Sequence, residues 1–230
     1  MPYMGFFIFV NEVIMNTKTK KLALLGLFSA MAYILTLFAR IPISSVEFLK
    51  YDPKDIVVLI LGFLMGPASA LGVTVVVCLI EAITVSTTGL IGFVMNVIST
   101  AAFACTAALI YKHKRTLGGV IFGLVSGIIT MSGLMLLWNY LITPLYMSIS
   151  REIIKDMLLP VFLPFNLIKG AINASLTMLL YKPVVKALKS TSLIEHTETK
   201  KSDVRFSVIA VSVIVIISCV LWILIIKGII

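Results

Sequence analysis

Charged residues are scarce in this sequence: they make up 13% of its 230 residues, whereas a soluble domain carries about a quarter. Hydrophobic residues make up 60%, and the mean hydropathy is +1.12. Several apolar runs reach the roughly 20 residues that a helix needs to cross a bilayer. No run shows the alternation of polar and apolar residues that is typical of a membrane barrel. The composition therefore predicts an all-α integral membrane protein with six or seven helices and no soluble domain.

Residues that usually carry chemistry are also scarce. The three cysteines, Cys78, Cys105 and Cys219, lie inside apolar runs without any CxxC or His/Cys cluster, so neither a disulfide framework nor a metal site is indicated. The two histidines, His113 and His196, lie in basic segments, and the sequence has no phosphate-binding P-loop. We therefore expect no enzyme, no metal and no cofactor, and any ATP must be hydrolysed by partner proteins.

Polar and basic segments divide the chain into apolar runs. The predicted spans are residues 22–40, 55–65, 68–86, 90–111, 117–143, 160–182 and 206–226. Residues 1–17 are predicted to be a poorly ordered N-terminal extension, 148–156 a polar loop and 191–205 a cytoplasmic linker. The span at 55–65 is short for a full crossing, but without it the basic clusters would fall on alternating sides of the membrane.

The basic residues predict the orientation of these spans. Twelve of the 19 Lys and Arg residues lie within 18–21, 112–115 and 182–205, which this topology places on one side. Cytoplasmic segments carry such an excess of Lys and Arg, so the N-terminus is predicted to be cytoplasmic. The same clusters explain the net charge of +9 without nucleic-acid binding.

Polar side chains inside four of the spans gather at a similar depth. Counting about 1.5 Å of rise per residue places five of them in the outer leaflet: Glu81, Asn96, Asn139, Asn166 and Lys169. Lipid cannot satisfy such groups, so they must face one another or a cavity. Hydrogen bonds between helices, including a Glu81–Lys169 pair, are the alternative. The layer is confined to one side, which indicates a binding pocket reached from outside.

The residue types in this layer suit a neutral ligand with many hydrogen-bonding edges, because amides, a carboxylate and an ammonium supply both donors and acceptors. Neighbouring aromatic rings can stack on a planar ligand or form the interfacial belt of a membrane protein: Trp138, Tyr140, Tyr146, Phe162 and Phe165. The segment 41–54 is a candidate lid over the pocket. Pro160 and Pro164 are predicted to mark the start of the helix that carries Lys169, and the deeper Asn173 is predicted to join helices.

The first predicted helix carries the small residues Ala23, Gly26 and Ala30 at helical spacing. Such small-xxx-small patterns let another helix approach closely. The partner is either a neighbouring helix of the same bundle or a second protein.

Three further segments add to this pattern: EFLKYDPKD at 47–55, WNYLITPLYM at 138–147 and LPFNLIKGAINA at 163–174. Together with the first helix they resemble the substrate-binding S-components of energy-coupling factor (ECF) vitamin transporters, and among them the riboflavin-specific group. The resemblance implies a six-helix substrate-binding domain over residues 18–190. The apolar segment at 206–230 is then an additional C-terminal transmembrane helix.

The resemblance also implies roles for single residues. Asn139, Asn166 and Lys169 are expected to bind riboflavin near the outer face, with Glu81, Asn96 and Tyr146 as further candidates. The small residues Ala23, Gly26 and Ala30 are expected to contact a transmembrane coupling subunit, and two ATPase subunits would drive uptake. The alternatives are an S-component for FMN or another vitamin, and a stand-alone secondary transporter. The latter would need ion-coupling carboxylates deeper in the membrane than Glu81.

Overall fold

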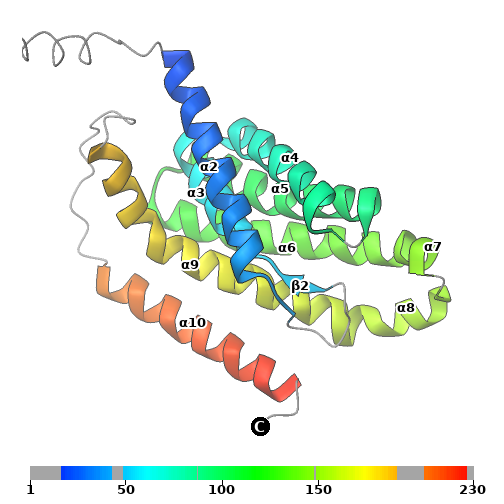
Figure 1. Ribbon diagram of the computed structural model, residues 1–230. Coiled ribbons are helices and arrows are strands. Elements are labelled where there is room, and N and C mark those ends of the chain that lie inside the picture. The colour runs from blue at the N-terminus through cyan, green and yellow to red at the C-terminus, as the bar shows by residue number, and fades with distance from the viewer. Residues whose placement is uncertain (1–16, 43–48, 87, 148, 191–204, 227–230) are drawn as a thin grey trace, which may run out of the picture.

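The computed structural model describes residues 17–42, 49–86, 88–147, 149–190 and 205–226. These residues form a helical bundle with one short antiparallel hairpin (Figure 1). In chain order the elements are α2 (Thr17–Ala39), β1 (Ile41–Pro42), β2 (Lys50–Tyr51), α3 (Lys54–Met65), α4 (Pro67–Thr84), α5 (Gly89–His113), α6 (Leu117–Leu141), α7 (Thr143–Met147), α8 (Arg151–Met157), the π-helical turn η1 (Leu158–Phe162), α9 (Leu163–Ser190) and α10 (Arg205–Ile226).

Five helical segments of the described residues are long and apolar enough to cross a membrane: Lys18–Ala39, Pro67–Thr84, Gly89–His113, Leu117–Leu141 and Arg151–Tyr181. The predicted class, an all-α integral membrane protein, is therefore confirmed, and the chain is a multi-pass membrane protein. The helix predicted at 206–226 is present as α10. The predicted extension at 1–17 and linker at 191–205 fall almost entirely outside the described residues.

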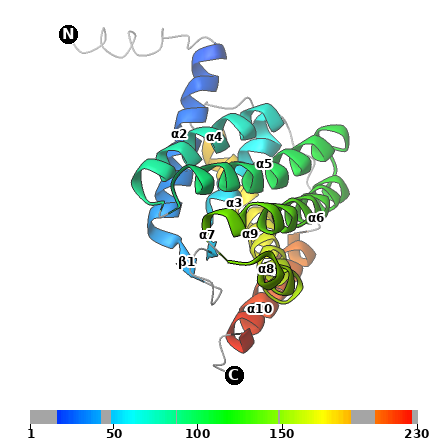
Figure 2. The same cartoon turned by 90° about the vertical axis from the view of Figure 1, so that its right-hand side faces the viewer.

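Helix α3 lies at the centre of the bundle. Viewed from the end that carries α7 and α8, it is near the middle, and it contacts α2, α4, α5 and α9 (Figure 2). Its residues from Lys54 to Phe63 are all buried. With 12 residues it is about 18 Å long, shorter than the roughly 30 Å hydrocarbon core. The longer helices around it therefore extend beyond its N-terminal end and enclose a space there.

A tight turn joins α3 to α4. Gly66 has φ +89, a conformation that costs a residue with a Cβ atom and that glycine adopts readily. Pro67 follows as the first residue of α4, where its fixed φ suits a helix and its missing N–H would have had no partner. These two residues reverse the chain directly, so α3 and α4 pack as neighbours.

One expectation about the region before α9 is wrong, and one is confirmed in part. Residues 148–156 were predicted to be a polar loop, but Arg151–Met157 form helix α8, and the Ser150 side chain caps it by accepting from the Ile153 backbone N–H. Pro164 does lie at the start of α9, as its second residue, but the helical path already runs from α8 through η1 into α9. Pro160 has no N–H to donate to the hydrogen bonds of a regular helix. It lies within the wider π-helical turn η1, which accommodates it, so the helical path continues from α8 into α9.

Helix α10 packs along α9 at the edge of the bundle (Figure 1). Ser212 and Cys219, two turns apart, are its buried positions, whereas Val213, Ile217 and Val220 are exposed. Small residues at the contact let two helices approach closely. Helix α10 thus has one narrow packed stripe and a broad apolar face.

Candidate functional site

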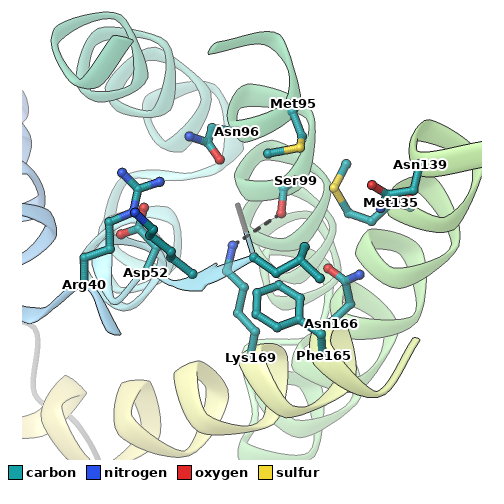
Figure 3. A pocket seen from close by; sticks show the side chains of 12 residues that line it. Arg40, Asp52, Met95, Asn96, Ser99, Met135, Asn139, Phe165, Asn166 and Lys169 are labelled. Atoms are coloured by element: carbon teal, nitrogen blue, oxygen red, sulfur yellow. Dashed lines mark hydrogen bonds between the residues drawn. The ribbon is translucent and has the colours of Figure 1, made fainter. Parts of the chain in front are cut away.

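A cavity of about 450 Å³ opens at the end of the bundle where α3 begins (Figure 3). Its lining comes from four parts of the chain: Arg40, Leu49, Lys50 and Asp52 between α2 and α3, Met95, Asn96 and Ser99 of α5, Met135 and Asn139 of α6, and Phe165, Asn166 and Lys169 of α9. The cavity arises because α3 is short. The longer helices around it continue beyond its N-terminal end and enclose the space there.

Four of the predicted site residues line this cavity: Asn96, Asn139, Asn166 and Lys169. Segments far apart in the sequence therefore bring their polar side chains to one place, and their role in binding a ligand stays a prediction. Tyr146 and Glu81 are not among the lining residues. Glu81 lies next to the cavity instead, where it pairs with Arg40 of the lining (3.4 Å).

The aromatic residues near the site divide into two groups. Phe165 lines the cavity, whereas Phe162 is fully buried in a cluster that packs α8 and α9 against β2. Trp138 packs on the main core, and Tyr140 is exposed. Phe165 is thus the aromatic side chain that a ligand in this cavity can contact directly.

Hydrogen bonds to their own helices orient two of the amides. The Nδ2 atom of Asn166 donates to the Phe162 carbonyl at 2.8 Å, and that of Asn139 donates to the Met135 carbonyl at 2.7 Å. The Asn139 oxygen also accepts from the Thr143 hydroxyl at 2.9 Å. A side chain held in this way loses little conformational freedom when a ligand binds. The cavity therefore presents preorganised amide edges.

The Lys169 ammonium is held by a carboxylate that the sequence reasoning missed. Its Nζ atom lies 3.2 Å from Asp55 Oδ2 and 3.4 Å from Ser99 Oγ. The suggested pair between Glu81 and Lys169 is therefore wrong. Asp55, the first residue of the span predicted at 55–65, lies fully buried in the first turn of α3. There it also complements the positive end of the helix dipole.

A second group of ion pairs adjoins the first. The fully buried Lys54 ammonium pairs with Asp52 and, at 2.8 Å, with Glu81. Burial alone would raise the pKa of Asp52, but the ammonium groups of Lys54 and Lys169 outweigh this effect and hold that pKa well below its usual range. Three cations and three carboxylates thus form ion pairs beside or beneath the cavity, and within these pairs the charges balance. Lys50, which also lines the cavity, adds a fourth cation.

A smaller hollow of about 320 Å³ continues from the cavity toward the start of α5. It shares Arg40, Lys50, Met95 and Asn96 with the cavity, and Val85, Ser86 and Thr88 complete its lining. Hydroxyl groups, an amide and two cations therefore surround it. This combination can hydrogen-bond a flexible chain that carries several oxygen atoms.

Comparison with known proteins supports a transport function. Residues 20–181 match the model of a family described as "ECF transporter, substrate-specific component". The chain is 31% identical to riboflavin transporter RibU of Staphylococcus aureus over 179 residues, which are 75% of this chain and 94% of that protein. It is 28% identical to riboflavin transporter FmnP of Bacillus subtilis over 192 residues, 76% of this chain and 99% of that protein.

A solved structure gives the same result for the fold. The S component of a bacterial ECF transporter superposes with a TM-score of 0.65 at 29% sequence identity. The superposition covers 75% of this chain and 99% of the other. The two proteins are therefore similar both in the arrangement of their helices and in sequence.

Proposed function

Because this chain belongs to the family of ECF transporter substrate-specific components, we propose that it binds riboflavin as the membrane subunit of an ATP-driven vitamin uptake system. One observation carries the proposal: Asn139, Asn166 and Lys169 surround a single cavity in a chain whose curated relatives are named riboflavin transporters. Riboflavin is then the transported substrate and not a cofactor, and the chain itself catalyses no reaction.

The chemistry of the cavity supports this ligand. Riboflavin has a planar, uncharged ring system with several donors and acceptors, and the oriented amides of Asn139 and Asn166 match such edges. Phe165 offers an aromatic surface beside them. The polyol tail of the vitamin suits the neighbouring hollow, where Ser86 and Thr88 supply hydroxyl groups. The balanced charges of the ion pairs suit a ligand without net charge.

A second candidate substrate is riboflavin phosphate, FMN. Lys50 lines both the cavity and the hollow, and it forms no ion pair with any of the described residues. An unpaired cation at the mouth favours an anionic group. Competition between riboflavin and FMN for the purified protein, repeated with Lys50→Met, separates the two, because only FMN binding should weaken in the variant.

The coupling to ATP rests on partner proteins. In the proposed orientation the N-terminus is cytoplasmic, and the cavity opens outward. Ala23, Gly26 and Ala30 are exposed on one face of α2, and no atom lies within 4 Å of a Cβ built on Gly26. This open face fits a helix of the transmembrane coupling subunit, which two ATPase subunits would drive.

A double substitution tests this division of labour. Replacing both Gly26 and Ala30 with Leu places bulk on the open face of α2 and leaves the cavity unchanged. We expect riboflavin uptake in cells to be lost, whereas riboflavin affinity of the purified protein stays within about twofold. Equal loss of uptake and binding would contradict the assignment of this face to a partner.

The absorbance spectrum of the purified protein tests the substrate. We expect a bound flavin in the wild-type protein, and about tenfold to hundredfold weaker binding in Lys169→Ala and Asn166→Ala, because each variant removes a buried hydrogen-bonding group. Leu167→Ala, on the exposed side of the same helical turn, is the matched control and should bind like the wild type. Unchanged affinity in both site variants would refute the assigned site.

A further inference from the structure

Helix α9 carries a further polar residue, Asn173, one turn beyond Lys169. Its side chain is fully buried, and it was predicted only to join helices. The amide oxygen accepts from the Tyr51 hydroxyl at 2.7 Å. The amide nitrogen lies 3.2 Å from Asp55 Oδ2 and 3.3 Å from the backbone carbonyl of Asp52. This one amide therefore holds both strand β2 and the first turn of α3 against α9.

The Asp55 carboxylate connects this amide to the cavity. Its Oδ2 atom, which accepts from Asn173, is also 3.2 Å from the Lys169 ammonium, and its Oδ1 atom accepts from the Thr100 hydroxyl at 2.6 Å. An ammonium has three N–H donors. Asp55 and Ser99 occupy two of those on Lys169, and the third is left for a ligand in the cavity.

Resting on the proposed function, we propose that Asp55 and Asn173 are positioning residues for flavin binding, which fix the Lys169 ammonium and strand β2 through one shared carboxylate. Neither residue lines the cavity. Asp55 acts through Lys169, which does line it, and Asn173 acts through β2, whose Lys50 lines it. We refer to the four linked side chains as the hub: Tyr51, Asp55, Lys169 and Asn173.

The chemistry of the hub explains why an amide occupies position 173. A neutral amide accepts from a hydroxyl and donates to a carboxylate at the same time. Burial raises the pKa of Tyr51, as do the nearby Asp55 and Asp52 carboxylates, so its hydroxyl keeps the proton that it donates. Aspartate at 173 would oppose Asp55 with a second negative charge. Leucine would leave the buried Tyr51 hydroxyl without its acceptor and would remove a donor from the Asp52 carbonyl and from Asp55, which keeps Lys169.

A double-mutant cycle on the full-length purified protein tests the link between Asp55 and Lys169. The substitution Asp55→Asn keeps the shape of the side chain and removes its charge. We expect it to weaken riboflavin affinity about tenfold in the wild-type background, but to change affinity by no more than about twofold in a Lys169→Met background, because the ammonium that it positions is then absent. A purely structural role predicts the same loss in both backgrounds, and that result would overturn the proposal.

A milder variant covers the case in which Asp55→Asn does not fold. Thr100→Val keeps the side-chain volume and frees the carboxylate on its α5 side, so it is tested in the same two backgrounds. We expect about threefold weaker riboflavin affinity in the wild-type background and no measurable change beside Lys169→Met. An equal loss in both backgrounds would again count against the hub.

The link to β2 has its own measurement. Tyr51→Phe removes the hydroxyl that Asn173 holds, so we expect the dissociation rate of riboflavin to rise about fivefold to tenfold with little change in the association rate. Tyr33→Phe is the matched control, because its hydroxyl bonds Thr84 between α2 and α4, and its kinetics should not change. Equal rates in wild type and Tyr51→Phe would remove β2 from the hub.

These results also separate the hub from the proposed function. Failure of the wild-type protein to bind riboflavin would refute the function. Whether Asp55 and Lys169 interact would then be tested by the unfolding temperatures of the same single and double variants without ligand. Additive effects there would show that the two side chains do not act on each other, and would overturn the hub.

Discussion

Helices α3 and α10 differ in nearly every property that usually identifies a transmembrane segment. Helix α10 has 22 residues, is almost entirely apolar and packs against the rest of the protein along one stripe. Helix α3 has 12 residues, begins with Lys54 and Asp55, and is buried from Lys54 to Phe63. The helix that looks like a good membrane span lies at the edge, and the helix that looks like a poor one begins beside the site and holds Lys169 through Asp55.

The surroundings of each helix explain this difference. Most described side chains of α10 are exposed and apolar, as expected for a helix that faces lipid. Protein covers α3 on all sides, and there a charge is tolerable when a partner of opposite charge lies beside it. The match to the family ends at residue 181, so α10 also lies outside the part of the chain that is common to the family. The comparison predicts large effects from changes in α3 and small ones from changes in α10.

The largest effect is expected at Lys54. The substitution Lys54→Met keeps most of the side-chain volume but leaves the Asp52 carboxylate, which accepts from Lys54, without its cation. Removing one partner of a buried ion pair costs about 3–5 kcal/mol. Thermal unfolding in a fixed detergent, without riboflavin, should show this loss of stability, or the protein should fail to accumulate.

Two further variants control this result. Lys186→Met, at an exposed position of α9, should leave the unfolding temperature nearly unchanged. In the double variant Asp52→Asn/Lys54→Met the stranded charge is absent, so stability should recover in part. A double variant as unstable as Lys54→Met alone would show that the cost does not arise from the unpaired Asp52 carboxylate.

The sequence predicts the positions of the helices better than it predicts which charged residues are buried among them. Hydropathy placed most of the long helices within a few residues of their positions, because each must present an apolar surface to lipid. The exception is α9, which continues to Ser190, eight residues beyond the end of the predicted span. Hydropathy could not place Asp55, since a carboxylate near the end of an apolar run reads equally well as part of an outer loop. Its burial depends on α3 starting at the centre of the bundle, and this is a property of the tertiary fold.

The second prediction concerns the packing of α3. A Cβ atom on Gly62 would lie 3.2 Å from the Ala108 Cβ and 3.3 Å from the Ala70 Cβ, so Gly62→Leu overpacks the contact between α3, α4 and α5. We expect a loss of about 1–3 kcal/mol in unfolding free energy. Gly133→Leu on α6 is the matched control, because no atom lies within 4 Å of its Cβ position. A similar loss in both variants would indicate a cost of leucine itself and not of the contact.

The candidate site was predictable in part for the same physical reason. Asn139, Asn166 and Lys169 stand out because a polar group in an apolar run needs an explanation. Arg40, Asp52 and Lys50 did not stand out, since charged residues are ordinary in a loop. Only the fold shows that this loop segment turns inward over α3. Sequence reasoning therefore found the part of the lining that comes from long helices. It named the segment 41–54 only as a candidate lid and gave no binding role to Arg40, Lys50 or Asp52, and residues 43–48 of that segment lie outside the described residues.

The smallest effect is expected from α10. Ser212→Leu enlarges a buried position in its packed stripe and should loosen α10 from α9, whereas Val213→Leu enlarges an exposed one and should not. Cys219 reports on the contact, because it is free and buried in the same stripe. In a Cys105→Ala background, a membrane-permeant maleimide should label Cys219 faster in Ser212→Leu than in Val213→Leu.

Riboflavin affinity should stay within about twofold in both, because no lining residue of the cavity belongs to α10. A tenfold loss of affinity in Ser212→Leu alone would show that α10 shapes the pocket through α9 and would remove the distinction between the two helices.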